Sequence, residues 1–572
     1  MKHITYLAIF LFSLTSCEDN KGNKKNDDNT PTATVYYNGD IIDMVGDLPI
    51  YQEALVEKNG TILFIGNREE AMKIAGEGHK MNDLKGKTML PGFIDAHAHF
   101  FAFGPQATGT NLLPPPDGGV KNIDELVNEL KIWSENPDNL EITGWIFGLG
   151  FDQTQLAEKR FPTKEDLDKV STEYPVLIMH ISAHFVVMNS KGLELVGITK
   201  ETPNPDGGII RRMPNSNEPN GVLEELAALP YIAQALAASD PERLAKQTKM
   251  GVEMAKSYGY TTLQDGKTME TFNALTSFAE QGLFDIDIVS YLDYTVAKYM
   301  DTEWNSKEYK DHYRVAGLKV TLDGAPQVQT AWKTEPYLVP PSGGKADYKG
   351  YPAIADEQEV ADLYKMVYKN NWQINSHANG DAAIDQLIRG LKAAEKEYGK
   401  KDLRNVLLHG QYVRPDQLDA LKELNVIVSL FPMHTYYWGD WHVEIVGEEA
   451  AKKISPTRTA LDKGLMLTIH TDAPVALPNL MRVVWIAASR TSRSGMVMGA
   501  NERLTPYEAL KCITDWSAYS HFEDDKKGTL EVGKLADLVV LSDNPLKVEI
   551  DAIKDIVVLQ TIKEGTIVFE RE

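Results

Sequence analysis

The chain has 572 residues, which is enough for one large barrel with insertions or for several domains. Hydrophobic residues make up 43% of the sequence, the proportion expected of a globular protein with a full core. The formal net charge is −23, and this acidity argues against a nucleic-acid partner, because binding phosphates requires clustered lysine and arginine. The two cysteines, Cys17 and Cys512, are too few for a disulfide scaffold.

The first 17 residues have the pattern of an export signal. The start is basic at Lys2, and residues 4–14 form an apolar run shorter than the roughly 20 residues that span a bilayer. Leu14-Thr15-Ser16-Cys17 resembles a bacterial lipobox, in which the cysteine is lipidated and becomes the mature N-terminus. An ordinary signal peptide with an incidental cysteine is the alternative. We expect a lipoprotein signal peptide at residues 1–17 and a lipid anchor at Cys17, which would hold the protein on a membrane of the cell envelope.

Residues 18–33 are polar, rich in Asn and Asp, and lack an apolar face, so they predict a flexible tether. The acidic residues directly after the lipobox also resemble a signal for export to the cell surface. Whether the anchored protein faces the periplasm or the surface stays open. Protease treatment of intact cells separates the two, because it removes only a protein that faces outward.

Short strands and turns are predicted at both ends of the mature chain. Near the start, strand-like runs adjoin hairpin-type turns at Asn38-Gly39 and Asn59-Gly60. Near the end, residues 536–541, 556–562 and 566–569 have the same character. Neither end contains enough strands for a stable sheet. We therefore predict one composite β-domain, built from residues 34–90 and 525–572.

Between these ends, apolar runs of strand length alternate with amphipathic helical segments such as 383–398 and 415–424. This alternation predicts a parallel sheet with crossover helices, and hence an α/β fold of the TIM-type (β/α)8 barrel class over residues 91–524. The stretch is longer than the roughly 250 residues of a plain barrel, so we expect an insertion at about 104–250. The strand-like runs are 144–149, 176–179, 259–263, 318–322, 372–377, 405–409, 426–430 and 465–470.

Residues able to bind metals lie in or directly after several of these runs. If residues 89–100 form one strand, Asp95, His97 and His99 share a face, and the two imidazoles can converge on one ion. Each candidate also has an ordinary explanation, since strand histidines are usually satisfied core or surface groups and Lys319 could pair with Asp323. Six such residues on one alternating pattern nevertheless predict a metal site. They are His97, His99, Lys319, His377, His409 and Asp472.

The same residues lie in motifs that resemble the amidohydrolase superfamily, in its amidohydrolase-3 group, which includes YtcJ-like proteins and N-substituted formamide deformylases. The resemblance covers nearly the whole mature chain, and its most specific part is the run from Leu90 to His99. The other matching stretches are 183–190, 318–326, 330–331 with 335–337, 377–381, 471–475, and 533–541 with Asn544-Pro545.

The resemblance implies a role for each residue. His97, His99 and Asp472 would bind the more buried metal, and His377 and His409 would bind the second. Lys319 would bridge the two ions as a carbamate, which offers two anionic oxygens where an ammonium has no lone pair. If Lys319 is not carbamylated, a single-metal site is expected instead.

The expected cofactor is one or two divalent ions, Zn²⁺ first among them, which lower the pKa of bound water and polarise a carbonyl. Asp472 would be the catalytic residue, taking the proton of this water and returning it to the leaving amine. His184 and His434 are expected to bind substrate, with a packing role as the alternative for each. His470 and Asp95 are candidates to orient the ligand side chains. The aromatic run Tyr436-Tyr437-Trp438 is expected to line either a substrate pocket or the core of a loop. Cys512 is expected in the hydrophobic core.

The expected function is therefore metal-dependent hydrolysis of a non-peptide C–N bond, of amide or N-formyl type, in a small organic molecule. Ester or lactone hydrolysis, or an isomerisation at the same site, is the nearest alternative. A surface lipoprotein that binds a nutrient is the alternative from another class, and a structural zinc fits poorly because such sites are closed and rich in cysteine. A homodimer is an open alternative to a monomer. The sequence leaves open the substrate, because loop residues decide it.

Overall fold

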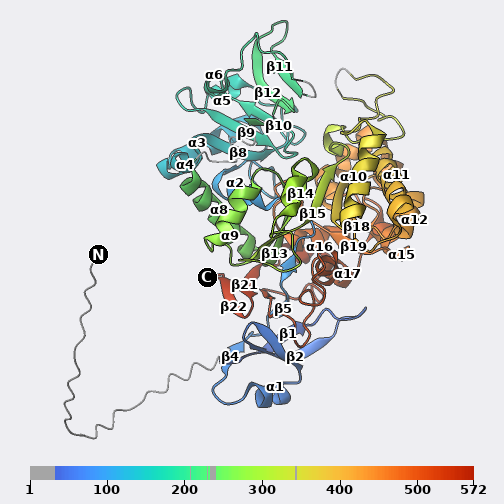
Figure 1. Ribbon diagram of the computed structural model, residues 1–572. Coiled ribbons are helices and arrows are strands. Elements are labelled where there is room, and N and C mark those ends of the chain that lie inside the picture. Colours follow the sequence, from blue (N-terminus) through green and yellow to red (C-terminus); the bar gives the residue numbers. More distant parts are fainter. Residues whose placement is uncertain (1–31, 206–207, 229, 232–239, 342–343) are drawn as a thin grey trace, which may run out of the picture.

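The computed structural model describes residues 32–572, except 206–207, 229, 232–239 and 342–343. The described residues form three β-sheets with helices around them (Figure 1). The expected signal peptide, the lipidation site Cys17 and most of the expected tether lie outside the described residues. Within the described part of the chain, none of the helices combines the length and hydropathy needed to cross a bilayer.

Strands from both ends of the chain form one eight-stranded sheet. Its strands are β1 (Thr34–Ile42), β2 (Tyr51–Lys58), β3 (Thr61–Gly66), β4 (Lys80–Asp83), β5 (Thr88–Pro91), β20 (Leu538–Leu541), β21 (Val558–Lys563) and β22 (Thr566–Glu570). The order is β22-β21-β20-β5-β1-β2-β3, and β4 pairs with β1. Because β5 pairs with β1 on one side and with β20 on the other, the two termini share one sheet.

Eight parallel strands in sequence order form the barrel. They are β6 (Phe93–Ile94), β13 (Tyr260–Thr268), β14 (Asp287–Asp293), β15 (Tyr313–Thr321), β16 (Gln373–Ala378), β17 (Val406–His409), β18 (Ile427–Leu430) and β19 (Leu467–Ile469). Each neighbouring pair is parallel, so all the carboxyl ends lie at one mouth. Strands of this kind are buried on both faces, which explains their continuous apolar runs. The predicted TIM-type α/β fold is confirmed.

The segment that carries His97 and His99 is not one strand, so this part of the sequence-based prediction was wrong. The chain passes from β5 in the composite sheet to β6 in the barrel at Gly92, and regular strand structure ends at Ile94. A Cβ atom at Gly92 would lie 2.3 Å from the side chain of Thr261, so the crossing requires glycine. Residues 95–98 follow the end of β6, outside regular strand structure, and all four are buried.

Hydrogen bonds beyond the strand ends join the first barrel strand to the last. The amide of Asp472 donates to the carbonyl of His97 at 3.0 Å, and the amide of His99 donates to the carbonyl of Ala473 at 2.8 Å. The buried carboxylate of Asp95 accepts from the hydroxyl of Thr471 at 2.6 Å. These bonds place Asp472 directly beside the two histidines.

A second sheet lies between β6 and β13 in the sequence. Its strands are β7 (Thr110–Asn111), β8 (Ile146–Phe151), β9 (Val176–His180), β10 (Phe185–Met188), β11 (Gly208–Arg212) and β12 (Pro219–Glu225). In Figure 1 this insertion lies beyond one end of the barrel, and the composite sheet lies beyond the other. Neighbouring residues of β9 and β10 alternate between two apolar clusters, so both faces of the insertion sheet are covered.

The helices begin with α1 (Arg68–Ala75), which packs on the composite sheet. The insertion and the first crossover contain α2 (Phe103–Thr108), α3 (Ile123–Ser134), α4 (Pro137–Thr143), α5 (Lys164–Asp168), α6 (Ser190–Val196) and α8 (Pro241–Ser257). The barrel adds α9 (Phe272–Glu280), α10 (Glu357–Asn370), α11 (Asp381–Tyr398), α12 (Pro415–Glu423), α13 (Met433–Val446), α14 (Glu448–Ala451), α15 (Thr457–Asp462), α16 (Leu480–Ser489), α17 (Pro506–Lys511) and α18 (Asp515–Ser520). Cys512, directly after α17, is a free buried thiol, as expected.

A buried ionic network joins the barrel to the composite sheet. Asp287 on β14 contacts the ammonium groups of Lys527 and, at 2.7 Å, of Lys563 on β21. Glu523 accepts from the guanidinium of Arg314 on β15 at 2.6 Å and lies 2.8 Å from Lys527. The five side chains are at most 3% exposed, so each charge depends on its neighbours rather than on water.

Candidate metal centre

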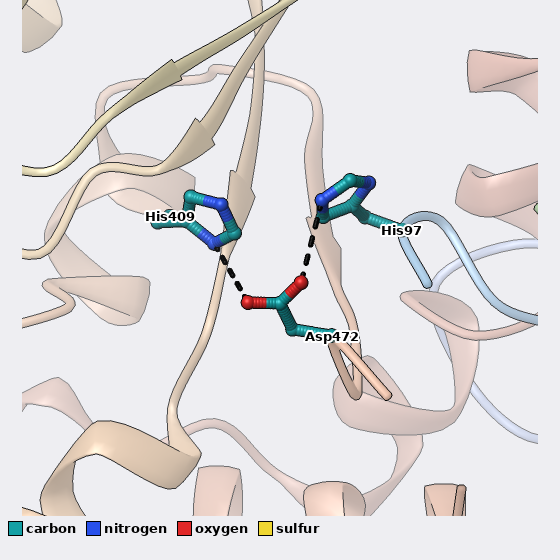
Figure 2. A group of neighbouring side chains, drawn as sticks. All are labelled: His97, His409 and Asp472. Carbon is teal, nitrogen blue, oxygen red and sulfur yellow. Dashed lines mark ion pairs between the residues drawn. The ribbon is translucent and has the colours of Figure 1, made fainter. Parts of the chain in front are cut away.

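His97, His409 and Asp472 converge at the carboxyl mouth of the barrel. One possible ligand atom from each lies within 4.8 Å of the other two. Figure 2 shows the carboxylate of Asp472 between the two imidazoles, with Oδ1 3.4 Å from His97 Nε2 and Oδ2 3.7 Å from His409 Nδ1. The residues come from three separate barrel strands or the loops that follow them. This group can therefore hold one cation at the mouth.

His99 and Lys319 complete the same cluster. The Nε2 atom of His99 lies 3.3 Å from Asp472 Oδ1, and its side chain is 30% exposed, so the cluster is open to solvent on this side. Lys319, near the end of β15, is buried, and its Nζ lies 3.2 Å from His97 Nε2. The lysine, the three histidines and the aspartate therefore lie around one point.

Gln264 fixes which nitrogen of His97 faces the cluster. Its side-chain amide donates to the carbonyl of Ala96 at 2.6 Å, so its carbonyl oxygen is the atom that lies 2.7 Å from His97 Nδ1. This oxygen must accept the Nδ1–H, which leaves a lone pair on Nε2. The strand β13, which carries Gln264, passes very close to the ring of His97: a Cβ atom at Gly266 would lie 2.3 Å from His97 Cε1.

The donor set fits a divalent cation. His97 Nε2 and Asp472 Oδ1 both carry lone pairs, they face each other at 3.4 Å, and Asp472 Oδ1 is buried without a hydrogen-bond partner among the described residues. Two electron-rich atoms aimed at one point leave a desolvation cost that a cation between them removes. Imidazole nitrogen and carboxylate oxygen are also ligands that zinc accepts.

Two members of the cluster adopt left-handed backbone conformations, which are uncommon outside glycine. The φ angle is +71° at His409 and +51° at Asp472. Such strain persists only where the surrounding structure imposes it, and it gathers at functional sites. Here the two residues lie at the end of β17 and in the loop after β19.

His377 stands next to His409, with ring centroids 4.6 Å apart. Its Nε2 lies 3.3 Å from the carbonyl of Gly324, which leaves Nδ1 as the nitrogen available to a ligand. Asp323 does not pair with Lys319. Its carboxylate instead accepts the amides of Asn379, Gly380 and Trp332 at 2.7–2.9 Å, and so ties the loop after β15 to the end of β16.

Burial favours the neutral form of three imidazoles at this site, those of His97, His377 and His409. It lowers the pKa of His97, His377 and His409 well below the usual value, and the charge of Lys319 lowers all three further. Neutral imidazoles have the lone pairs that metal binding requires. Burial also lowers the pKa of Lys319 to about 7, so a large share of this amine is neutral near neutral pH.

The two expected substrate-binding histidines lie on different elements around the mouth. His184, directly before β10 in the insertion, places Nδ1 2.7 Å from Glu225 Oε2. His434, at the start of α13, is buried edge-on against Phe431, with ring centroids 4.7 Å apart. His470 lies beside His409, with its Nε2 3.1 Å from His409 Nδ1, and its Nδ1 bonds Ser429. Asp95 bonds the backbone of His97 and not its ring.

Two residues of the mouth were missed by the sequence reasoning. Gln264 and Lys267 both lie on β13, which was expected to end at Leu263 but continues to Thr268. The polar residues that directly follow the apolar run were the available signal, because polar side chains at strand ends gather at a barrel mouth.

The tyrosines of residues 436–438 lie in helix α13, and the hydroxyl of Tyr437 donates to Asp117 of the insertion at 2.6 Å.

Comparison with known proteins decides the family. The amidohydrolase-3 model, described as the amidohydrolase family, matches residues 80–569. The chain belongs to the amidohydrolase family. The expected resemblance is thereby confirmed, and the match includes every residue of the cluster.

This amidohydrolase is 25% identical to YtcJ of Bacillus subtilis (strain 168) over 91% of its own length and 96% of that protein. It is 26% identical to an N-substituted formamide deformylase of Arthrobacter pascens, over 91% of its own length and 95% of that enzyme. Among solved structures, an uncharacterized metal-dependent hydrolase from Pyrococcus furiosus aligns with a TM-score of 0.70 and 27% identity, covering 90% of this chain and all of the other. The chain therefore has a metal-dependent hydrolase fold with candidate metal-binding residues.

Proposed function

We propose that this amidohydrolase is a metal-dependent enzyme that cleaves a non-peptide C–N bond, of amide or N-formyl type, in a small organic molecule. The observation that carries the proposal is the convergence of His97 Nε2, His409 and Asp472 on one point at the barrel mouth. The similarity to an N-substituted formamide deformylase supports the choice of bond.

We propose the ligand assignment that the family resemblance implies, and the positions of the side chains support it. His97, His99 and Asp472 would hold one ion, with Asp472 Oδ1 within 3.4 Å of both imidazoles. His377 and His409, whose rings are adjacent, would hold a second ion. Lys319 would bridge the two as a carbamate, and its lowered pKa of about 7 supports this, because only the neutral amine reacts with CO2.

A bound divalent ion would supply Lewis acidity, which polarises the substrate carbonyl and lowers the pKa of water. The protein's own contribution to proton transfer is Asp472, which accepts a proton from the attacking water and delivers it to the leaving nitrogen as the C–N bond breaks. Its exposure of 12% admits water and substrate, and its position beside three imidazoles fixes the carboxylate. Gln264 keeps His97 in the tautomer that presents a lone pair.

Metal analysis of the purified protein tests the proposal. We expect one or two divalent ions per chain, loss of hydrolysis on chelation and recovery with Zn²⁺. A metal-free protein that remains active would rule the mechanism out. A panel of matched amides, N-formyl compounds, esters and lactones then tests the bond, and preference for the oxygen compounds would favour ester or lactone hydrolysis instead.

Attachment to the cell envelope is part of the same proposal, and the lipobox-like run that ends at Cys17 supports it. We expect the protein to partition with membranes and to incorporate labelled fatty acid, and the Cys17→Ser variant to lose both properties. Membrane partitioning that is unchanged in this variant would contradict a lipid anchor at Cys17. Protease treatment of intact cells decides which side the protein faces.

A further inference from the structure

The side-chain amide nitrogen of Gln264 donates two hydrogen bonds beside His97. One goes to the carbonyl of Ala96 at 2.6 Å, and the other goes to Nε2 of His521 at 3.1 Å. The carbonyl oxygen of the same amide accepts from His97 Nδ1 at 2.7 Å. The reverse orientation of the amide would set the carbonyl oxygens of Gln264 and Ala96 against each other, so it is excluded. His97, Gln264 and His521 are at most 1% exposed, so bulk water cannot replace these bonds.

The orientation of Gln264 determines which nitrogen of His521 carries the proton. Because Gln264 donates to it, Nε2 of His521 is an acceptor, and the proton of the neutral ring lies on Nδ1. Burial lowers the pKa of His521 to about 3, which favours this neutral ring. The Nδ1 atom is buried and has no hydrogen-bond partner among the described residues. The other tautomer would set two N–H groups against each other, so the unpaired Nδ1–H is the smaller cost.

His521 is itself held in place by its neighbours. It lies directly after α18, and its main-chain carbonyl accepts from the guanidinium of Arg314 at 2.7 Å. Arg314 is fixed in turn by Glu523 in the buried ionic network. The ring of Tyr291 packs against the ring of His521, with centroids 6.1 Å apart. The acceptor that His521 offers to Gln264 therefore has a fixed position.

We propose that His521 is a positioning residue of the metal centre, which holds the amide of Gln264 in the orientation that keeps the proton of His97 on Nδ1 and the lone pair of Nε2 directed at the metal. The inference rests on the proposed function and adds a residue to its metal centre. His521 would act through Gln264, since its ring bonds no other side chain among the described residues. Loss of its lone pair would leave a buried N–H of Gln264 unpaired and free the amide to shift.

Two variants of similar side-chain length separate the hydrogen bond from packing. His521→Met fills the space with only a weak acceptor, whereas His521→Gln keeps a carbonyl oxygen that can accept from Gln264. We expect His521→Met to weaken the affinity for Zn²⁺ by about 3- to 10-fold, less than the loss of a direct partner of a ligand histidine. His521→Gln should stay within about twofold of the unaltered protein, because the acceptor is restored. Competition with a chromogenic chelator measures both, and equal losses in the two variants would overturn the proposal.

A double variant tests whether His521 acts through Gln264. Gln264→Leu removes the amide, so adding His521→Met to it should not weaken metal affinity further. Effects of the two substitutions that multiply would overturn the proposal.

His312→Met is the matched control. His312 is a partly buried histidine whose Nδ1 lies 2.7 Å from Asp287 in the ionic network. This variant should lower the thermal stability and leave metal affinity unchanged. Weakening equal to that in His521→Met would show a general effect of destabilisation and overturn the proposal.

Neutron diffraction of the unaltered, metal-loaded protein provides a test that needs no variant. We expect deuterium on Nδ1 of His97 and on Nδ1 of His521, and none on Nε2 of His521. Deuterium on Nε2 of His521 would overturn the proposal, whether or not the variants fold.

The outcomes separate this inference from the proposed function. Metal-dependent C–N cleavage, with the same metal affinity in the unaltered protein and in His521→Met, would overturn the positioning role and leave the function standing. Metal affinity that depends on His521 through Gln264, in a protein that cleaves no C–N bond, would support the positioning role and overturn the function.

Discussion

The Nε2 atom of His97 lies 3.2 Å from the Nζ atom of Lys319, although 222 residues separate them in the chain. Gln264 holds the Nδ1–H of His97, so Nε2 presents a lone pair toward the lysine. A protonated Lys319 could donate a hydrogen bond to this lone pair. Burial, however, lowers the pKa of Lys319 to about 7. The neutral amine, or a carbamate formed from it, leaves the lone pair of His97 for a metal ion.

Replacing Lys319 tests whether it supports the metal centre. We expect Lys319→Ala to lose bound metal and to lower kcat/KM by about 100-fold or more, because a bridging ligand would be removed from the polarising ions. Added short carboxylic acids should restore part of the activity by occupying the space of the carbamate. Metal analysis and kinetics measure both effects. Full metal content and normal kinetics in Lys319→Ala would contradict a bridging role.

Asp472→Asn separates an enzyme from a binding protein. We expect kcat to fall by about 10²- to 10⁴-fold, the range for loss of a general acid–base, while the affinity for a substrate analogue changes little. Asparagine tolerates the left-handed φ of +51° at this position, so the fold should survive. The control is Asp419→Asn, which changes an exposed carboxylate on α12. Turnover that is unaffected by Asp472→Asn would contradict the proposed catalytic role.

Gln264 is expected to control metal affinity through His97. Gln264→Leu removes the acceptor for His97 Nδ1–H and frees the ring to change tautomer. We expect metal affinity to weaken by about 10- to 100-fold, as is typical when a partner behind a ligand histidine is lost. Competition with a chromogenic chelator measures this. An unchanged affinity, with the thermal stability also unchanged, would show that the tautomer is set by another group.

The buried network around Glu523 predicts a stability that depends on pH. Although burial opposes it, the charges of Lys527 and Arg314 lower the pKa of Glu523 from 4.5 to about 2. The folded-state pKa lies below the unfolded value, so the ionised carboxylate stabilises the fold above pH 4.5, and this contribution is lost as the pH falls toward 2. By linkage the contribution is about 3 kcal/mol at pH 7 and about half of that near pH 3.

Urea unfolding of the unaltered protein and of Glu523→Gln measures this contribution as a difference at each pH. Burial raises the pKa values of Asp95 and Asp323 to about 7, so these two residues give the stability the opposite dependence on pH. Both proteins contain them, and taking the difference cancels their contribution. We expect the variant to be less stable at pH 7 and the gap to narrow between pH 4.5 and 3. A gap that stays constant over this range would contradict a depressed pKa at Glu523.

The barrel could be predicted from the sequence because strands buried on both faces require continuous apolar runs, and crossover helices between them require amphipathic ones. The order of His97, Lys319, His377, His409 and Asp472 along that pattern indicated a shared mouth for the same reason. The detail around His97 could not be predicted. The alternation of side chains was interpreted as that of one continuous strand. In the structure the chain passes from one sheet to another at Gly92, and residues 95–98 are buried.

The sequence by itself determined the family, the class of fold and the residues able to bind a metal, because these depend on residue types at given spacings. Only the tertiary structure decided that Gln264 orients His97, and that Asp323 ties loops together and does not pair with Lys319. Each of these relationships joins residues from different strands or from the loops that follow them. Their distances depend on how the barrel closes and where the insertion packs, which no local pattern records.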